Sequence, residues 1–271
     1  MFSQRIIVAI FIIPLTVGAV YAGGWFYAVL ILALLGTSAW EYWRMFQKGG
    51  LCPSRSILIG GVFLLAASRD WLGFTYSHLV LSAIILLAMF MHTIAYERGI
   101  DCSASSFAAT LSGVLYLGWI GAYLFSLRNL PDGTWWALTV VPSAALADSG
   151  AYIFGKRFGR HQFSTRVSPK KTWEGYLGGI LFGTALTVLL ASLWHLRAPA
   201  VTPLDGLIIG AALSILCPFG DLGESMLKRQ FGLKDSSSLL PGHGGMFDRI
   251  DSWLWAAVIG YYLVLWLTGS F

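Results

Sequence analysis

The chain has 271 residues, of which 56% are hydrophobic and only 11% are charged, whereas about a quarter of the residues in an ordinary soluble domain are charged. This composition excludes a water-soluble fold. The net charge of +5 would suggest nucleic acid as a partner in a soluble protein, but here we attribute it to basic loops that face anionic lipid or a phosphate ligand. We therefore expect a lipid bilayer, and no nucleic acid, as a partner.

Apolar segments recur along the whole chain, and a helix that crosses a bilayer needs about 20 such residues. They predict an all-α polytopic membrane protein. The nine expected transmembrane helices lie near residues 6–22, 25–40, 57–68, 78–95, 107–126, 134–155, 176–194, 206–220 and 252–270. We expect residues 1–130 to supply about five scaffold, dimer or lipid-facing spans, and residues 131–271 to form the catalytic region.

The third expected span is short, so the basic residues provide an independent check on the number of spans. With nine spans, 15 Lys and Arg residues fall on one side of the membrane and 3 on the other, and the positive-inside rule assigns the richer side to the cytoplasm. Without the third span the division would be 7 and 11. The sequence thus predicts nine spans, a cytoplasmic N-terminus, an external C-terminus, and cytoplasmic loops at 156–175 and 221–251.

Charged residues in the first 130 positions, including Glu41 and Arg69, are interpreted as ordinary solvated or interfacial charges. From Asp148 onward the polar residues gather on the predicted cytoplasmic side, so we expect the function there. Asp148 itself lies in an apolar segment, where a carboxylate is costly and usually marks a functional site. The alternative is a carboxylate at a helix end that pairs with Lys156.

The predicted loop 156–175 carries six basic residues. Three interpretations are open: a topology signal, a site for anionic lipid headgroups, and part of a polyphosphate-binding site. Ser168 and Thr172 favour the last, because their hydroxyls flank Lys170 and Lys171 on a proline-containing turn. Hydroxyl and ammonium groups are suitable donors to phosphate.

Three carboxylates border the predicted loop 221–251. Asp221 follows the eighth span, whereas Asp248 and Asp251 precede the ninth, so they would converge if these spans are neighbours. Asp248 and Asp251 share one helix face because they are three residues apart, and like charges so placed repel unless a cation lies between them. We therefore expect a hard, oxygen-seeking ion such as Mg²⁺; the alternative is neutralisation by Arg249 and nearby lysines.

The remaining polar features indicate a reaction class. The chain has no GxSxG, no HExxH and no cysteine nucleophile with a partner, so acyl transfer and metalloproteolysis have no support. His243 lies in a glycine-rich turn and is expected to contact phosphate or donate a proton, although a lone structural histidine is the alternative. Carboxylates, cations and glycine turns together fit phosphoryl or nucleotidyl transfer.

The second half of the chain resembles the phosphatidate cytidylyltransferases, also called CDP-diacylglycerol synthases. The signature reads Ser225-Met226-Leu227-Lys228-Arg229, then four residues, then Lys234-Asp235-x-Ser237-x-x-Leu240-Pro241-x-His243-Gly244-Gly245-Met246-x-Asp248-Arg249-Ile250-Asp251. Blocks at 147–152, 168–175 and 220–225 also resemble that family. Many members have Gly where this chain has Lys170, so Lys171 is expected to be the family lysine.

The resemblance implies an enzyme of the inner (cytoplasmic) membrane, a homodimer whose active site faces the cytoplasm, that uses Mg²⁺ to join CTP to phosphatidic acid and releases pyrophosphate. It implies catalytic roles for Asp221, Asp248, Lys171 and Arg249. It implies substrate-binding roles for Ser168, Lys170, Thr172, Lys228, Arg229, Lys234, Asp235, His243 and Gly244. Asp221 and Asp248 are the expected metal ligands, and the further candidates, which could hold a second cation, are Asp148, Glu224 and Asp251.

Three other functions are alternatives to this one. A CTP-dependent lipid kinase shares the membrane setting and the nucleotide, but the unbroken signature speaks against it. A transporter for a phosphorylated or anionic solute would also place charges in the membrane, yet it predicts paired broken helices in two related halves, and no such symmetry is present. A CDP-alcohol phosphotransferase would need a different aspartate pattern.

Overall fold

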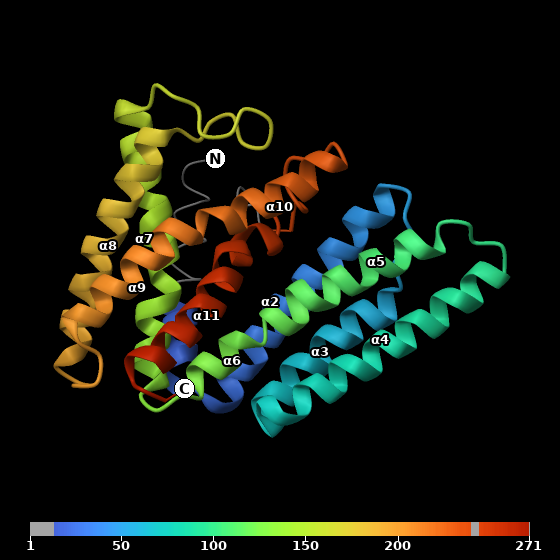
Figure 1. Ribbon diagram of the computed structural model, residues 1–271, viewed down its shortest axis with the longest axis horizontal. Helices are drawn as coiled ribbons and strands as arrows, with labels where there is room; N and C mark the ends of the chain where they lie inside the picture. The colour runs from blue at the N-terminus through green and yellow to red at the C-terminus, as the bar shows by residue number, and fades with distance from the viewer. Residues whose placement is uncertain (1–13, 240–243, 271) are drawn as a thin grey trace. The chain divides into compact units, whose positions relative to one another are not determined.

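Every regular element in the computed structural model is helical over the residues it describes, 14–239 and 244–270. The prediction of an all-α protein is therefore confirmed. Helical residues 14–22 are followed by α2 (Gly24–Lys48), α3 (Arg55–Leu72), α4 (Phe74–Glu97), α5 (Ser103–Gly113), a π-helical segment η1 (Val114–Ile120), α6 (Tyr123–Arg128), α7 (Gly133–Phe158), α8 (Trp173–His195), α9 (Pro203–Leu216), α10 (Pro218–Gln230) and α11 (Phe247–Leu267) (Figure 1).

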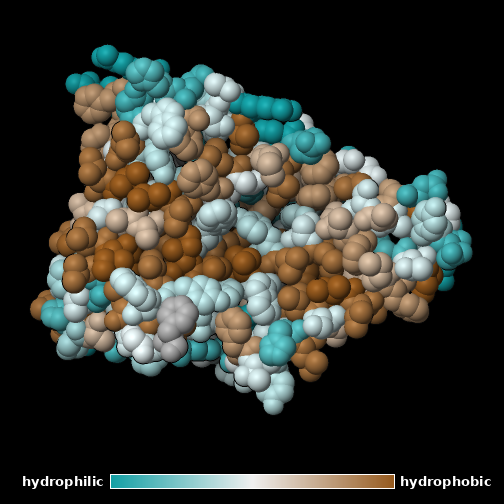
Figure 2. Space-filling view, in the orientation of Figure 1, coloured by the Kyte–Doolittle hydropathy of each residue, from teal (hydrophilic) through white to brown (hydrophobic). Residues whose placement is uncertain are grey.

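Seven helical segments of the described chain are long and apolar enough to cross a membrane: Gly24–Lys48, Phe74–Glu97, Ser103–Arg128, Gly133–Phe158, Trp173–His195, Pro203–Gln230 and Phe247–Leu267. Large apolar side chains such as Leu86 and Phe90 on α4 are exposed, and Figure 2 shows apolar residues over much of the visible face. Exposed apolar surface of this extent belongs in contact with lipid. The chain is a multi-pass membrane protein.

Two of the nine expected spans account for the difference in number. The first, near 6–22, lies outside the described residues up to residue 13, and its described part, 14–22, is helical. The third forms α3, a helix as expected, but it contains Arg55, Arg69 and Asp70 and so differs from the seven apolar segments. The count of nine and the orientation of the termini stay predictions.

One compact unit comprises residues 1–126 and 230–250. Within it, Arg69 on α3 is only 2% exposed, and its guanidinium lies 3.6 Å from the centroid of the Phe74 ring and donates hydrogen bonds to Ser77 and Ser126. A buried cation with hydroxyl and aromatic partners stabilises the packing of these helices. The interpretation of Arg69 as a solvated or interfacial charge is wrong.

The other compact unit comprises residues 127–229 and 251–271. Helices α7, α8 and α9 run side by side in it (Figure 1), and small residues allow their backbones to approach. A Cβ added to Gly183 of α8, for example, would lie 2.8 Å from Cα of Ala147 on α7. This packing supports the helices that carry the polar residues described below.

Helix α10 begins where the sequence indicates the start of a loop. Pro218 stands at its first position, directly after Cys217 at the end of α9, and proline is favoured at the first turn of a helix but interrupts a helix interior. Residues 221–230 are too polar to look like part of a span, yet they continue as helix to Gln230. Asp221 and Glu224 are therefore held on a helix, whereas the sequence suggests a loop.

Candidate active site

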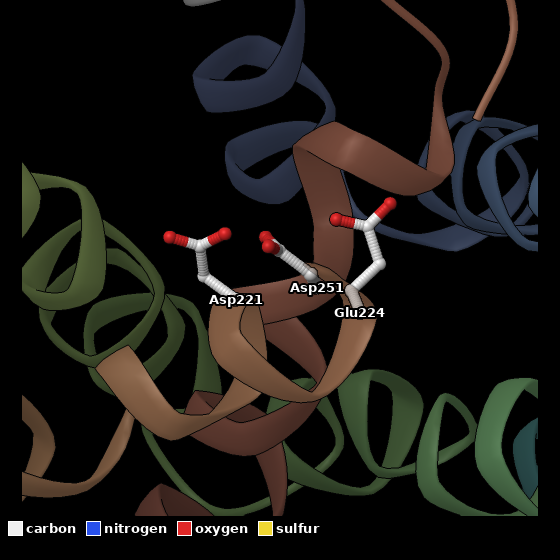
Figure 3. A group of neighbouring side chains, drawn as sticks. All are labelled: Asp221, Glu224 and Asp251. Atoms are coloured by element: carbon white, nitrogen blue, oxygen red, sulfur yellow. The ribbon is translucent and has the colours of Figure 1, made fainter. Parts of the chain in front are cut away.

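Three carboxylates converge in the second unit. Asp221 and Glu224 project from α10 and Asp251 from the first turns of α11, and oxygen atoms of all three lie within 4.8 Å of one another (Figure 3). Glu224 is fully buried and Asp251 is 5% exposed, while Asp221 is half-buried. Carboxylates at this separation repel strongly where the dielectric is low, so the arrangement suits a cation held among them.

Local sequence explains how the two helices bring these side chains together. Asp221 and Glu224 are three residues apart and therefore share one face of α10. Immediately before them, a Cβ on Gly220 would lie 3.0 Å from the carbonyl oxygen of Asp251 and 2.7 Å from Cδ1 of Trp255. The glycine thus permits α10 to approach α11 closely enough for the cluster to form.

Two lysines accompany the cluster. Lys228, one turn after Glu224 on α10, donates to Glu224 Oε2 at 2.7 Å, and both side chains are buried. Lys171, in the segment before α8, forms an ion pair with Asp221. The cluster therefore combines hard oxygen donors with ammonium groups, a combination that binds both a divalent cation and phosphate.

The segment that presents Lys171 folds back on itself. Phe163 N donates to the Lys171 carbonyl at 2.8 Å, Trp173 N donates to the His161 carbonyl at 2.9 Å, and Lys171 N donates to the Ser168 carbonyl at 3.1 Å. These hydrogen bonds fix the direction in which Lys171 leaves the backbone, and the Ser168 carbonyl closes the turn that was expected from the sequence.

Thr172 and Glu174 hold the same segment against α8. Thr172 is the N-cap of α8, where its hydroxyl accepts a hydrogen bond from Gly175 N at 3.2 Å; such caps stabilise a helix start. Glu174 Oε2 accepts from Arg160 N at 3.0 Å and from His161 N at 3.2 Å. Lys170, in contrast, is exposed.

Asp148 lies on α7, in the same unit as the cluster. Its side chain is exposed and near enough to Asp251 for the two carboxylates to interact electrostatically. Arg229 is exposed at the end of α10. The second unit thus holds the expected residues Lys171, Asp221, Glu224, Lys228 and Asp251 in one connected group.

The other expected residues belong to the first unit. Asp248 Oδ2 accepts hydrogen bonds from Ser236 N at 3.0 Å, Ser236 Oγ at 2.8 Å and Gly245 N at 2.7 Å, so this carboxylate also organises the segment before α11. Lys234, Asp235 and Arg249 are exposed, and Gly244 is half-buried. His243 lies outside the described residues.

The chain matches a model of the cytidylyltransferase family over residues 3–267. It belongs to this family. The chain is 34% identical to the phosphatidate cytidylyltransferase of Pseudomonas aeruginosa, with 99% of this chain and 98% of the relative aligned. It is 32% identical to that of Synechocystis, over 98% and 97% of the two chains, and 31% identical to that of Bacillus subtilis, over 97% of each.

Glu41 is a residue of this cytidylyltransferase whose importance the sequence analysis missed. Its side chain on α2 is fully buried and accepts four hydrogen bonds, from Ser236 Oγ, Ser237 Oγ, Met246 N and Phe247 N. The interpretation of Glu41 as a solvated or interfacial charge is wrong. The available signal was a carboxylate between aromatic residues next to an apolar run, where ionisable groups are rarely placed without a function.

Proposed function

We propose that this cytidylyltransferase transfers the cytidylyl group of CTP to phosphatidic acid and forms CDP-diacylglycerol and pyrophosphate. The observation that carries the proposal is the convergence of Asp221, Glu224 and Asp251 with Lys171 and Lys228 in a multi-pass membrane chain. The names of the relatives, phosphatidate cytidylyltransferases, supply the substrates.

The reaction needs little covalent help from the protein. An oxygen of the lipid phosphate attacks the α-phosphorus of CTP, a new P–O bond forms, and the bond from the α-phosphorus to the bridging oxygen breaks to release pyrophosphate. The second ionisation of a phosphate monoester has a pKa of about 6, so the nucleophile is largely dianionic at neutral pH. A general base is therefore not required.

In this proposal Asp221, Glu224 and Asp251 hold Mg²⁺, whose preference for carboxylate oxygens they match. The chemistry supplied by the ion at these ligands is neutralisation of phosphate charge and polarisation of the α-phosphorus. Asp148 stays a candidate ligand beside them. The assignment of Asp248 as a metal ligand rests on the sequence resemblance and stays a prediction.

The chain's own cations stabilise the negative charge that develops as pyrophosphate leaves. Lys171 lies beside the cluster through Asp221, and a preorganised ammonium contributes most where water is scarce. Lys228 pairs with Glu224 and orients its carboxylate. The roles proposed for the other cations and polar groups follow from the resemblance: Ser168, Lys170, Thr172, Arg229, Lys234, Asp235, His243, Gly244 and Arg249.

We further propose that the reaction takes place at the cytoplasmic surface of the inner membrane and that the enzyme is a homodimer. CTP is a cytosolic solute, and the basic segments predicted on the cytoplasmic side include the one that carries Lys171. The diacyl chains of the substrate remain in the leaflet, so its phosphate meets the nucleotide at the surface.

A direct test uses the purified protein in detergent micelles with CTP, phosphatidic acid and Mg²⁺. We expect lipid-extractable cytidine and pyrophosphate to appear in equal amounts, to disappear with EDTA, and to be absent when diacylglycerol replaces phosphatidic acid because diacylglycerol lacks the attacking phosphate. Turnover that needs diacylglycerol, or that survives chelation, would contradict the proposal.

A further inference from the structure

We propose that Glu41 is a positioning residue for two stretches proposed to bind substrate, residues 234–237 and 244–249. Its buried carboxylate fixes both ends of the loop that joins α10 to α11. The inference rests on the proposed function, because this loop carries residues assigned above to the nucleotide and the metal. Glu41 itself is assigned no contact with substrate.

The hydrogen bonds of Glu41 come from both ends of the loop. Ser237 Oγ and Met246 N donate to Oε1 at 2.5 and 3.0 Å. Ser236 Oγ and Phe247 N donate to Oε2 at 3.0 and 2.8 Å. Each carboxylate oxygen therefore accepts one hydroxyl from the start of the loop and one backbone N–H from its end.

These donors are adjacent in sequence to residues proposed to act on the substrate. Ser236 follows Lys234 and Asp235 directly, and Phe247 precedes Asp248 and Arg249. A single carboxylate thus ties together the two backbone stretches that present these side chains. A group-transfer reaction requires that the side chains acting on the substrate are held to within a fraction of an ångström, and these backbone stretches position them.

Asp248 completes the same network. Ser236 Oγ lies 3.0 Å from Glu41 Oε2 and 2.8 Å from Asp248 Oδ2, so the two carboxylates share the single proton of one hydroxyl. Any shift of Glu41 therefore changes the hydrogen bonding of Asp248, whose carboxylate is a predicted metal ligand.

Two consecutive glycines make room for this network. Gly244 has φ +78°, and a Cβ there would lie 2.8 Å from Asp248 Oδ2. A Cβ on Gly245 would lie 2.5 Å from Glu41 Oε2 and 2.7 Å from Oε1, and would also overlap Ser236 Oγ. The loop backbone passes directly against the Glu41 carboxylate, an approach that only glycine allows.

The donor pattern requires two accepting oxygens on the Glu41 side chain. Four donors converge on two oxygens, and a carboxylate can accept at both. In Glu41→Gln one oxygen becomes an NH₂ group, which donates and cannot accept. Depending on how the amide is turned, the hydrogen bond from Met246 N or the one from Phe247 N is lost. The substitution preserves the size of the side chain and removes at least one connection between the loop and α2.

The experiment compares Glu41→Gln with Glu97→Gln, the same change at an exposed position of α4. Hydrogen–deuterium exchange of peptides that contain Met246 and Phe247 is measured beside kcat and KM for CTP in micelles. We expect faster exchange and a roughly 10- to 100-fold lower kcat in Glu41→Gln only, with unchanged exchange in α7–α9 and an unchanged profile in size-exclusion chromatography.

Gly245→Ala provides a second variant that leaves Glu41 in place but displaces its carboxylate, with Gly60→Ala as its control because a Cβ on Gly60 meets no atom within 4 Å. We expect the same faster hydrogen exchange of the loop and the same loss of kcat in Gly245→Ala. If the wild type turns over and both Glu41→Gln and Gly245→Ala keep its kcat, the inference is overturned. A loss of kcat without faster hydrogen exchange in the loop would also overturn it. An inactive wild-type protein would instead refute the proposed substrates.

Discussion

Lys171 and Asp221 form an ion pair that connects the segment before α8 to helix α10. Lys171 is 28% and Asp221 31% exposed at the side chain, so the pair is reachable from solvent while its neighbours Glu224 and Asp251 are buried. An incoming polyphosphate can therefore meet Lys171 at the accessible edge of the carboxylate cluster. The ion pair thus joins the basic segment before α8 to the first turn of α10.

The substitution Asp221→Asn is expected to lower kcat by about 100-fold or more, because it keeps the shape of the side chain and removes a charge proposed to hold the cation. Turnover in micelles at saturating CTP measures the effect. Asp132→Asn is the matched control: Asp132 is exposed at the N-cap of α7 and makes no capping hydrogen bond there. Near-normal activity of Asp221→Asn would show that the cluster is not the metal site.

The neighbouring lysines 171 and 170 are expected to differ in importance. Lys171→Gln should reduce kcat/KM for CTP by about 10- to 100-fold, since it removes the cation that contacts Asp221 and is proposed to meet the phosphates. Lys170 is exposed, and Lys170→Gln should change kcat/KM by a few-fold at most. Steady-state kinetics at one ionic strength give kcat/KM for CTP for both variants and so compare the two lysines. Equal losses would mean that only the summed charge of the segment is important.

The buried pair Glu224 and Lys228 should behave as a unit in stability measurements. Lys228→Met leaves the Glu224 carboxylate buried without its cation, which costs about 3–5 kcal/mol. Adding Glu224→Leu removes the uncompensated charge and should restore much of the thermal stability in detergent, but it should not restore turnover. A single Lys228→Met variant as stable as the wild type would contradict the arrangement.

The sequence predicted the kind of fold and the location of function, but several contacts depend on tertiary packing. Long apolar runs identify membrane helices with little context, because lipid demands about 20 apolar residues per crossing. Helix α10 has no such run after Asp221, so hydropathy indicates a loop where Pro218 in fact starts a second helix. The convergence of Asp221 and Asp251 was expected only if their helices are neighbours, and Gly220 is the residue that lets them approach.

Glu41 and Arg69 show what composition and spacing leave undetermined. Both resemble interfacial charges in the sequence, since each lies close to the end of an expected span. Their burial becomes visible only when their partners are known: loop hydroxyls and N–H groups for Glu41, aromatic rings for Arg69. The partners of Glu41 are remote in sequence; for Arg69, Phe74 is close in sequence but Trp119 is remote.

The native cysteines allow the predicted orientation to be tested by chemical labelling. Cys52 is exposed and Cys102 half-buried, and both lie in segments predicted to be cytoplasmic. A membrane-impermeant maleimide should label them after permeabilisation of the cells and leave them unmodified in intact cells. Cys52→Ser and Cys102→Ser variants assign the labelling. Modification in intact cells would reverse the predicted orientation.

The thiols of Cys52 and Cys102 should also differ in their rate of alkylation by the maleimide. The hydrogen bond from Ser106 to Cys102 Sγ, together with one from Cys52, lowers the pKa of the Cys102 thiol, while donation to Cys102 raises the pKa of Cys52. A lower pKa means more thiolate at pH 7, and the thiolate is the nucleophile. Cys102 should therefore be alkylated faster near neutral pH, with the difference shrinking as the pH rises above both pKa values. Mass spectrometry of briefly labelled protein measures this order, and faster labelling of Cys52 would contradict it.

The most direct test of the central proposal follows two radioactive labels in CTP. Protein in micelles receives phosphatidic acid, Mg²⁺ and CTP labelled at either the α- or the γ-phosphorus, and the lipid phase is extracted. Nucleotidyl transfer predicts that the α-label enters the lipid, that the γ-label leaves as pyrophosphate, and that Asp251→Asn abolishes both events. Entry of the γ-label into lipid would contradict the account and identify a lipid kinase.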